Sequence, residues 1–136
     1  EAGRLALAAG ASRFVPLQVS GPFHSSLMRP AAERFAPELA AADVTPARIP
    51  VVANVTAQPV TAPDEIRRLL VAQIYSPVHW EESVRLMLAS GIGTFLEIGP
   101  GRVLAGLIRR VDRTARIACV GDESGLKEAL AILGEV

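Results

Sequence analysis

The sequence has one cysteine, no excess of charge of either sign and no long apolar run. Its single cysteine, Cys119, cannot form a disulfide within the chain, which fits a reducing compartment, and we expect a cytoplasmic location. Lys and Arg together number 14, as do Asp and Glu, so the chain lacks the electrostatic footprint of a protein that binds nucleic acid or an anionic membrane surface. Without an apolar run of about 18 residues, we expect no membrane span.

Side chains that bind a metal or attack a substrate are also few. His24, His79 and Cys119 are scattered along the chain without the close spacing typical of metal ligands, so we expect no metal site. We expect His79 to be structural or at the surface, because nothing near it in the sequence pairs with it. No serine or cysteine lies in the local sequence of a catalytic nucleophile, such as Gly-X-Ser-X-Gly.

The chain does contain an alternation of strand and helix patterns over 136 residues, half of them apolar. This length suffices for one domain or for a piece of a larger one. Residue patterns predict strands at 14–19, 49–55, 94–98 and 117–120. Helical spacing of apolar residues predicts helices at 1–9, 26–42, 61–76, 80–88, 103–111 and 123–133. Strands that alternate with helices imply parallel crossovers, and we therefore predict an α/β fold with a layered sheet.

Individual residues indicate where these elements begin, end or bend. Pro37 should kink or interrupt the helix at 26–42, because proline lacks the N–H that a helix interior needs. We expect a turn at 56–59, after which Thr61 caps the next helix. Gly91 should supply the carboxyl-terminal stop of the helix that begins at Trp80.

His24 lies between the predicted strand at 14–19 and the predicted helix at 26–42. We expect it at the carboxyl end of a strand, where open α/β sheets bind their ligands. A catalytic role and a structural one, in which the ring bonds backbone groups, are both open at this point. Gln73 lies in an otherwise apolar part of its helix, and a buried amide without partners costs about 1–3 kcal/mol.

A glycine turn at 99–101 joins the predicted strand at 94–98 to the predicted helix at 103–111. Backbone donors at a helix start attract anions, so a phosphate loop is one interpretation. However, a dinucleotide fingerprint would need glycine in place of Leu104, and the Gly-Lys-Ser/Thr of a Walker loop is absent. A tight turn that permits close strand-to-helix packing is therefore favoured.

Four arginines lie on or beside the helix at 103–111 and form a small candidate basic face. They are Arg102, Arg109, Arg110 and Arg113. A solvated face is the default interpretation of such a cluster, and docking of a partner is the alternative.

Four blocks of the sequence resemble, in order and spacing, the malonyl-CoA:acyl-carrier-protein transacylase family, and less closely the acyltransferase domains of polyketide synthases. The blocks are Val-Ser-Gly-Pro-Phe-His-Ser at 19–25, Pro-Val-Val-Ala-Asn-Val-Thr at 50–56, Gln-Ile-Tyr-Ser-Pro-Val-His-Trp at 73–80 and Glu-Ile-Gly-Pro-Gly-Arg-Val-Leu at 97–104. The resemblance covers essentially the whole chain but only the carboxyl-terminal part of the family's domain. It implies the end of a ferredoxin-like small subdomain at 1–20 and the carboxyl-terminal portion of an α/β-hydrolase-like acyltransferase core at 21–136.

The resemblance also implies an enzyme, an acyl-carrier-protein S-malonyltransferase of fatty-acid biosynthesis. In that family a serine of a Gly-His-Ser-Leu-Gly elbow attacks malonyl-CoA, and a histidine, here His24, is its base. A main-chain carbonyl, here that of Gln73, fixes the histidine tautomer. The malonyl group then passes from the serine to the phosphopantetheine thiol of acyl carrier protein. Malonyl-CoA is thus a substrate, and no bound cofactor is implied.

Three further assignments rest on the same resemblance. Phe23 matches the malonyl-selecting members, where bulk beside the acyl pocket excludes the extra methyl of methylmalonyl, a discrimination of about 1–3 kcal/mol. Asn54 is a weaker candidate for the substrate site, because it follows a predicted buried strand. The four arginines of the basic face are candidate contacts for the acidic carrier protein.

The departures from the family pattern are large. The chain has no serine elbow, no glutamine-rich amino-terminal block and no counterpart of the arginine that grips the malonyl carboxylate. We therefore expect the chain alone to be inactive and to need an amino-terminal half that carries the serine. Two alternatives stay open: a non-enzymatic α/β interaction domain derived from an acyltransferase, and an acyltransferase domain of a polyketide synthase.

Overall fold

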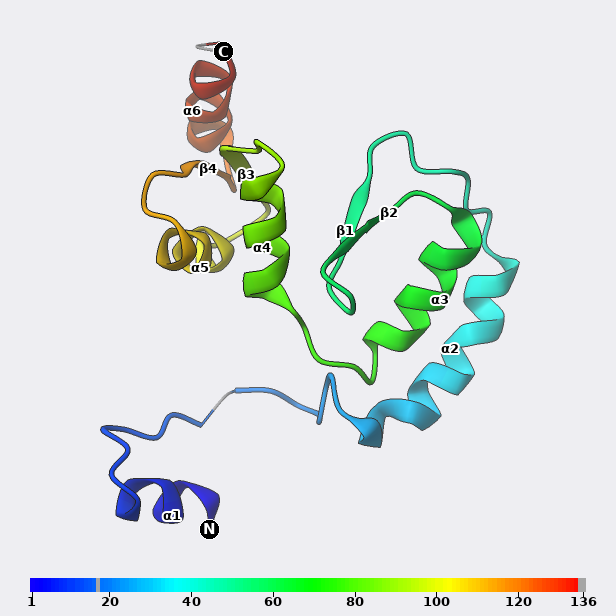
Figure 1. Cartoon of the computed structure of the whole chain (residues 1–136), viewed down its shortest axis with the longest axis vertical. Helices are drawn as coiled ribbons and strands as arrows, with labels where there is room; N and C mark the ends of the chain where they lie inside the picture. Colours follow the sequence, from blue (N-terminus) through cyan, green and yellow to red (C-terminus); the bar gives the residue numbers. More distant parts are fainter. Residues whose placement is uncertain (17, 135–136) are drawn as a thin grey trace.

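The computed structural model describes residues 1–16 and 18–134. It is a mixed helix and sheet structure (Figure 1). Its helices are α1 (Ala2–Ala8), the 3₁₀ helix η1 (Ser26–Met28), α2 (Arg29–Ala41), α3 (Pro63–Gln73), α4 (Trp80–Ala89), α5 (Val103–Val111) and α6 (Glu123–Gly134). Its strands are β1 (Val51–Ala53), β2 (Gln58–Val60), β3 (Thr94–Ile98) and β4 (Arg116–Val120).

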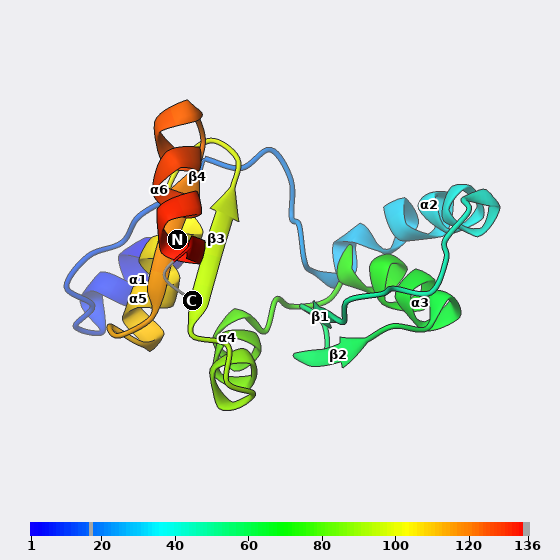
Figure 2. The same cartoon turned by 90° about the horizontal axis from the view of Figure 1, so that it is seen from above.

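Two groups of elements account for most of the molecule. One group, residues 21–76, contains η1, α2, β1, β2 and α3, and we call it the helix–hairpin unit. The other, residues 80–134, contains α4, β3, α5, β4 and α6, and we call it the sheet unit. Figure 2 shows the two units on opposite sides of the molecule, joined by the chain between α3 and α4.

The sheet unit is a parallel crossover with a contiguous apolar core. β3 pairs in parallel with β4, from Thr94 opposite Arg116 to Ile98 opposite Val120, and α5 makes the connection. The core cluster consists of Val84, Phe95, Ala105, Ile108 and Ile117. The strands and helices predicted for this part of the chain are confirmed. Apolar residues of α4, α5 and both strands meet in this core, whereas Leu126, Leu130 and Leu133 of α6 are about half exposed.

Close packing in the sheet unit also depends on one glycine. Gly125 is buried in the first turn of α6, directly against the end of β4. A Cβ atom at this position would collide with the carbonyl oxygen of Cys119. The helix can therefore approach the strand this closely only because residue 125 has no side chain.

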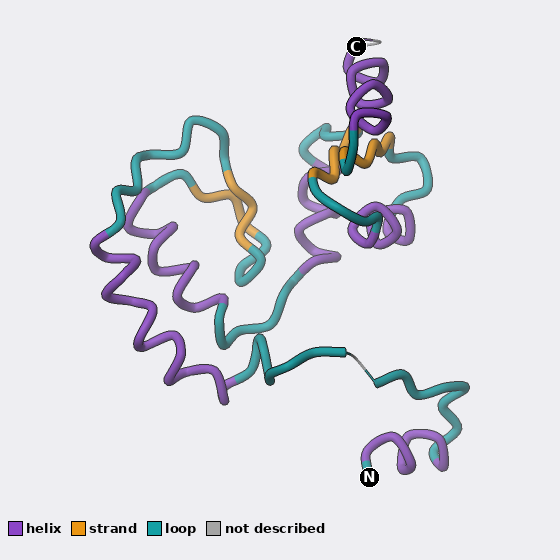
Figure 3. The backbone as a smooth tube through the Cα atoms, turned by 180° about the vertical axis from the view of Figure 1, so that it is seen from behind, coloured by secondary structure: helices purple, strands orange, loops and turns teal. Residues whose placement is uncertain are grey.

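In the helix–hairpin unit, two helices lie beside a short antiparallel hairpin. α2 and α3 run side by side in opposite directions (Figure 3). β1 and β2 pair with Val51 opposite Val60 and Ala53 opposite Gln58, and Ala57 takes a positive φ of 51° in the turn between them. The sequence predicted parallel crossovers and no strand at 58–60, so this antiparallel hairpin was not expected.

Three predicted features in and beside the hairpin differ from the structure. The run at 49–55 is not one buried strand, because only Val51–Ala53 is extended in a ladder and Ile49 is 80% exposed. The turn lies at 54–57 and β2 begins at Gln58, so only the first half of the predicted turn at 56–59 is confirmed. Thr61 does not cap α3: the N-cap is Ala62, without a side-chain hydrogen bond, although proline does begin the helix as expected.

The predicted strand at 14–19 is also absent from the described residues, and Leu17 within it lies outside them. The Phe14 ring packs instead on α1, where a Cβ at Gly3 would lie 2.7 Å from it. A β-prone run becomes a strand only where a partner strand is available to pair with it. The expectation that His24 follows the carboxyl end of a strand is therefore wrong.

The expected interruption at Pro37 does not occur, and α2 runs unbroken from Arg29 to Ala41. Pro37 leaves the carbonyl of Glu33 without its helical donor. Both residues are exposed, so water can satisfy that carbonyl. Among the described residues, no helix combines the length and apolar character that a bilayer crossing requires.

Candidate active site

His24 lies in the loop just before η1, and its backbone has a positive φ of 59°. This left-handed conformation is uncommon for a residue with a side chain and persists only where the surroundings hold it. The His24 N–H donates to the carbonyl oxygen of Ile74 at 3.2 Å, just after the end of α3. A residue 50 positions away along the chain thus fixes the loop.

The imidazole of His24 is oriented from the same place. Its Nδ1 lies 2.9 Å from the main-chain oxygen of Gln73. A carbonyl oxygen only accepts hydrogen bonds, so this contact assigns the proton to Nδ1 and leaves a lone pair on Nε2. An imidazole in this tautomer can take a proton at Nε2, as a general base must.

Gln73 also places its side-chain amide near the ring, with Nε2 of Gln73 3.2 Å from Nδ1 of His24. That nitrogen is a donor and competes with the carbonyl for the opposite tautomer. The carbonyl contact is shorter, and the Gln73 amide has another acceptor in the oxygen of Ser76 at 3.3 Å. We therefore assign the Nδ1–H tautomer. The amide of Gln73 thus has partners and does not carry the cost of an unpaired buried amide.

An apolar hollow of about 540 Å³ lies beside His24, between the start of α2 and the end of α3. Its lining comprises Phe23, His24, Met28, Ala31, Phe35, Leu70, Gln73 and Ile74. Phe23 is 54% exposed, and the His24 residue is also exposed. The histidine therefore has open space beside an apolar wall, an arrangement that suits a base next to an organic substrate.

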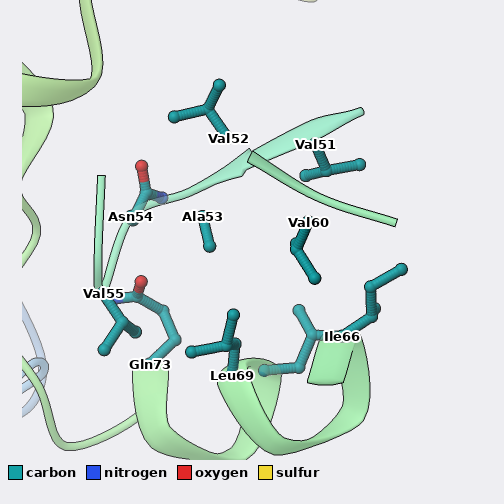
Figure 4. Close-up of a pocket in the computed structure, with 10 residues that line it drawn as sticks. Val51, Val52, Ala53, Asn54, Val55, Val60, Ile66, Leu69 and Gln73 are labelled. Carbon is teal, nitrogen blue, oxygen red and sulfur yellow. The ribbon is translucent and has the colours of Figure 1, made fainter. Parts of the chain in front are cut away.

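A second, smaller pocket of about 140 Å³ lies between the hairpin and α3 (Figure 4). Asn54 and Gln73 both line it, whereas Asn54 does not line the hollow beside His24. The main-chain oxygen of Asn54 accepts the N–H of His79 at 2.8 Å. Asn54 and His24 thus line different pockets, and Gln73 lines both. His79 is the N-cap residue of α4, in line with its predicted structural role, but its Nδ1 lies 3.4 Å from Glu82 Oε1, so the expectation that nothing near it pairs with it is wrong.

The glycine turn at 99–101 begins α5 with its own carboxylate. Glu97 accepts the N–H groups of Leu104 at 3.1 Å and of Ala105 at 2.8 Å. These hydrogen bonds, that of Ala105 first, lower the pKa of Glu97. The donors of Leu104 and Ala105 are therefore occupied, which disfavours a phosphate loop. The positive φ values of Gly99 and Gly101, 129° and 100°, fit a tight turn, but a Cβ at either position would meet nothing within 4 Å, so neither glycine is needed for close strand-to-helix packing.

The basic face lies in the sheet unit, apart from His24. Arg102 is the N-cap residue of α5, Arg109 and Arg110 are in its last turn, and Arg113 follows it. All four are exposed, and none forms a salt bridge with another described residue. Among the described residues, no group of three or more His, Cys, Asp or Glu is placed to hold a metal ion.

Sequence patterns missed one contact near the histidine. The guanidinium of Arg29 lies over the Tyr75 ring, 4.4 Å from its centroid. Tyr75 is the only tyrosine of the chain and follows Gln73 by two residues, which is a weak signal. Nothing in the spacing of α2 indicated that Arg29 would meet it.

The parallel β3–α5–β4 crossover defines the chain as an α/β protein, and the contact of His24 Nδ1 with the Gln73 oxygen gives it a candidate acid–base site. No known family model matches the chain. Over 134 residues the chain is 46% identical to the malonyl CoA-acyl carrier protein transacylase of Bacillus subtilis (strain 168), and over 131 residues it is 43% identical to that of Escherichia coli (strain K12). These matches cover 98% and 96% of this chain but 42% of each relative.

Solved structures agree with the sequence matches. The acyl-carrier-protein S-malonyltransferase of Burkholderia pseudomallei 1710b superposes with a TM-score of 0.89 at 42% identity, covering 96% of this chain and 42% of that one. A malonyl-transacylase in complex with a type II polyketide-synthase acyl carrier protein gives a TM-score of 0.89 at 44% identity, with the same coverage. By sequence and by fold, the chain is thus homologous to the carboxyl-terminal part of malonyl CoA-acyl carrier protein transacylases.

Proposed function

We propose that this chain is the histidine-bearing part of an enzyme that transfers the malonyl group of malonyl-CoA to the phosphopantetheine thiol of acyl carrier protein, in fatty-acid biosynthesis. The observation that carries the proposal is the 2.9 Å contact between His24 Nδ1 and the Gln73 carbonyl oxygen. It leaves Nε2 free to act as a base beside an open apolar hollow. The relatives, which are malonyl CoA-acyl carrier protein transacylases, supply the substrate class.

The proposed chemistry uses His24 twice in each half-reaction. Nε2 removes the proton from a serine hydroxyl while the serine oxygen bonds to the thioester carbon of malonyl-CoA. When the carbon–sulfur bond breaks, the imidazolium returns that proton to the coenzyme A thiolate. In the second half-reaction, the phosphopantetheine sulfur bonds to the carbonyl carbon of the malonyl-serine while His24 takes the thiol proton. The carbon–oxygen bond to the serine then breaks, and the imidazolium returns the proton to the serine oxygen. One thioester replaces another, so the exchange is nearly neutral in free energy.

The serine is the part of this chemistry that no residue of the chain supplies in the right local sequence. We infer that it comes from an amino-terminal half, because the chain spans 42% of the length of these relatives. We further propose that residues 21–136 belong to an α/β-hydrolase-like core and residues 1–20 to the end of a ferredoxin-like subdomain. The parallel β3–α5–β4 crossover supports the first assignment.

The surrounding residues receive narrower proposed roles. Phe23 lines the hollow beside His24 and would limit the size of the acyl group. Asn54 would act only indirectly, because it shares the smaller pocket with Gln73. The four arginines of the basic face would contact the acidic carrier protein, since they are exposed and lack acidic partners among the described residues.

Intact-mass spectrometry after incubation with malonyl-CoA tests whether the nucleophilic serine comes from the amino-terminal half. The isolated chain should gain no malonyl adduct, whereas the chain joined to the amino-terminal remainder of the Bacillus subtilis relative should gain one malonyl group on a serine. A stable adduct on a serine of the isolated chain would contradict the proposal. The joined protein in which the elbow serine is replaced by alanine is the matched control, and it should remain unmodified.

A polyketide-synthase carrier protein is a second candidate for the acceptor. One structural neighbour is a malonyl-transacylase bound to a type II polyketide-synthase acyl carrier protein. Transfer rates from the joined protein to one fatty-acid carrier and one polyketide carrier would separate the two. A higher kcat/KM for the fatty-acid carrier is the expected result, and the reverse preference would assign the enzyme to polyketide synthesis.

A further inference from the structure

The position of His24 depends on how its loop meets the end of α3. Its backbone N–H donates to the Ile74 oxygen at 3.2 Å, and its ring donates to the Gln73 oxygen at 2.9 Å. Both acceptors lie at the carboxyl-terminal end of the same helix. Because His24 holds a positive φ, any separation of the loop from α3 would let its backbone relax.

The ring contact is also a balance between two partners of opposite type. The Gln73 carbonyl oxygen, at 2.9 Å from Nδ1, requires a proton there, and the Gln73 amide nitrogen, at 3.2 Å, favours its absence. The two distances differ by a few tenths of an ångström. A small shift of the loop relative to α3 therefore decides which ring nitrogen carries the proton.

A third contact, between Arg29 and Tyr75, also joins this part of the chain to the segment after α3. Arg29 is the first residue of α2, five positions after His24, and its guanidinium lies 4.4 Å from the centroid of the Tyr75 ring. The Tyr75 N–H donates to the Ala72 oxygen at 3.2 Å, so the main chain of Tyr75 is held to the last turn of α3. The pair thus ties the start of α2 to the segment that carries both acceptors of His24.

We propose that Arg29 and Tyr75 are positioning residues that keep His24 in its Nδ1–H tautomer. The relevance of this tautomer to catalysis rests on the proposed function, whereas the effect of the pair on the tautomer does not depend on any activity. Without the pair, the packing of α2 against α3 and the bond from the His24 N–H to the Ile74 oxygen remain, but the start of α2 and the loop before it can shift slightly relative to the end of α3. The Gln73 carbonyl then loses its advantage over the Gln73 amide, and the Nε2–H form, which is useless as a base at Nε2, gains population.

Nitrogen NMR of the full chain with ¹⁵N-labelled histidine tests this directly, at a pH where the rings are neutral. The measured quantity is the ratio of Nδ1–H to Nε2–H tautomer at His24, with the His79 signals removed by a His79→Gln background. Arg29→Ala and Tyr75→Ala should each lower this ratio by about two- to fivefold, as expected for losing one exposed cation–π contact. Arg29→Lys and Tyr75→Phe keep a cation and a ring and should retain the ratio.

Arg34→Ala, which removes an exposed arginine from the same helix, is the matched control and should leave the ratio unchanged. The double variant Arg29→Ala/Tyr75→Ala should lower the ratio no further than the larger single change, because both remove one contact. If Tyr75→Ala disturbs the fold, the tautomer ratio of Arg29→Gln, which removes only the cation, tests the proposal without a change at Tyr75. An unchanged ratio in the folded Arg29 variants would overturn the inference, and would leave the base role of His24 to be decided by rates.

Discussion

The sheet unit and the helix–hairpin unit differ in what their side chains do. In the sheet unit, Phe95, Ile108 and Ile117 are buried together in one cluster, and a carboxylate caps α5. In the helix–hairpin unit, His24 and Phe23 are exposed beside a hollow, and His24 holds an uncommon backbone conformation. The comparison indicates that stability is concentrated in one unit and chemistry in the other, so substitutions in the two should affect different measurements.

Truncation of a core side chain in the sheet unit should give the largest loss of stability. Ile108→Ala removes a 5% exposed side chain from the centre of the cluster and should lower the free energy of unfolding by about 2–5 kcal/mol. Ile98→Ala, at an 80% exposed position of the same unit, should change it by less than about 0.5 kcal/mol. Urea denaturation of the chain measures both, and equal effects would break the comparison.

The close approach of α6 to β4 gives a second test within the sheet unit. Gly125→Ala should destabilise the chain by about 1–3 kcal/mol, because its Cβ meets the Cys119 carbonyl. Gly106→Ala is the matched control in α5, where a Cβ meets nothing within 4 Å, and it should stabilise by up to about 1 kcal/mol. Thermal denaturation would contradict this account if both substitutions moved the midpoint in the same direction.

In the helix–hairpin unit the expected effect is on selectivity and not on stability. Phe23→Ser should raise methylmalonyl transfer relative to malonyl transfer in the joined enzyme by a factor that corresponds to about 1–3 kcal/mol. The free energy of unfolding should barely change, since Phe23 is half exposed. Competition between the two thioesters measures the ratio, and an unchanged ratio would remove Phe23 from the acyl site.

The smallest expected effect concerns the cap of α5. The pKa of Glu97 is lowered in the folded chain, chiefly by the N–H of Ala105, from an ordinary value of 4.5. The stability that this carboxylate contributes is therefore present above about pH 4.5 and is lost as the pH falls through the lowered pKa. Glu97→Gln should flatten this acid limb of the stability curve. An unchanged dependence on pH between 5 and 3 would contradict the capping role.

The two units also differed in how far the sequence predicted them. The period of Leu104, Leu107 and Ile108 predicted α5, whose buried residues are Ala105 and Ile108, although Leu104 itself is 41% exposed. The run at 14–19 carried the same kind of signal and formed no strand among the described residues, since pairing depends on partners distant in the sequence.

The candidate site shows the same limit. His24 and Gln73 were identified by resemblance, although 49 positions separate them, and their contact was found in the structure. For Arg29 and Tyr75, 46 positions apart, the sequence offered only the weak signal that Tyr75 follows Gln73 by two residues, and the spacing of α2 gave none for Arg29. Periodicity reports which face of an element is covered and not which residue of another element covers it.

The central claim is that His24 acts as the base through Nε2, and the rate of malonyl transfer by the joined enzyme tests it most directly. We predict that His24→Ala lowers this rate by about 10²–10⁴-fold, with the free energy of unfolding almost unchanged because the side chain is exposed. His79→Gln, at the other histidine, should leave the rate within about twofold of the parent. A His24→Ala enzyme that transfers malonyl at the parent rate would contradict the account.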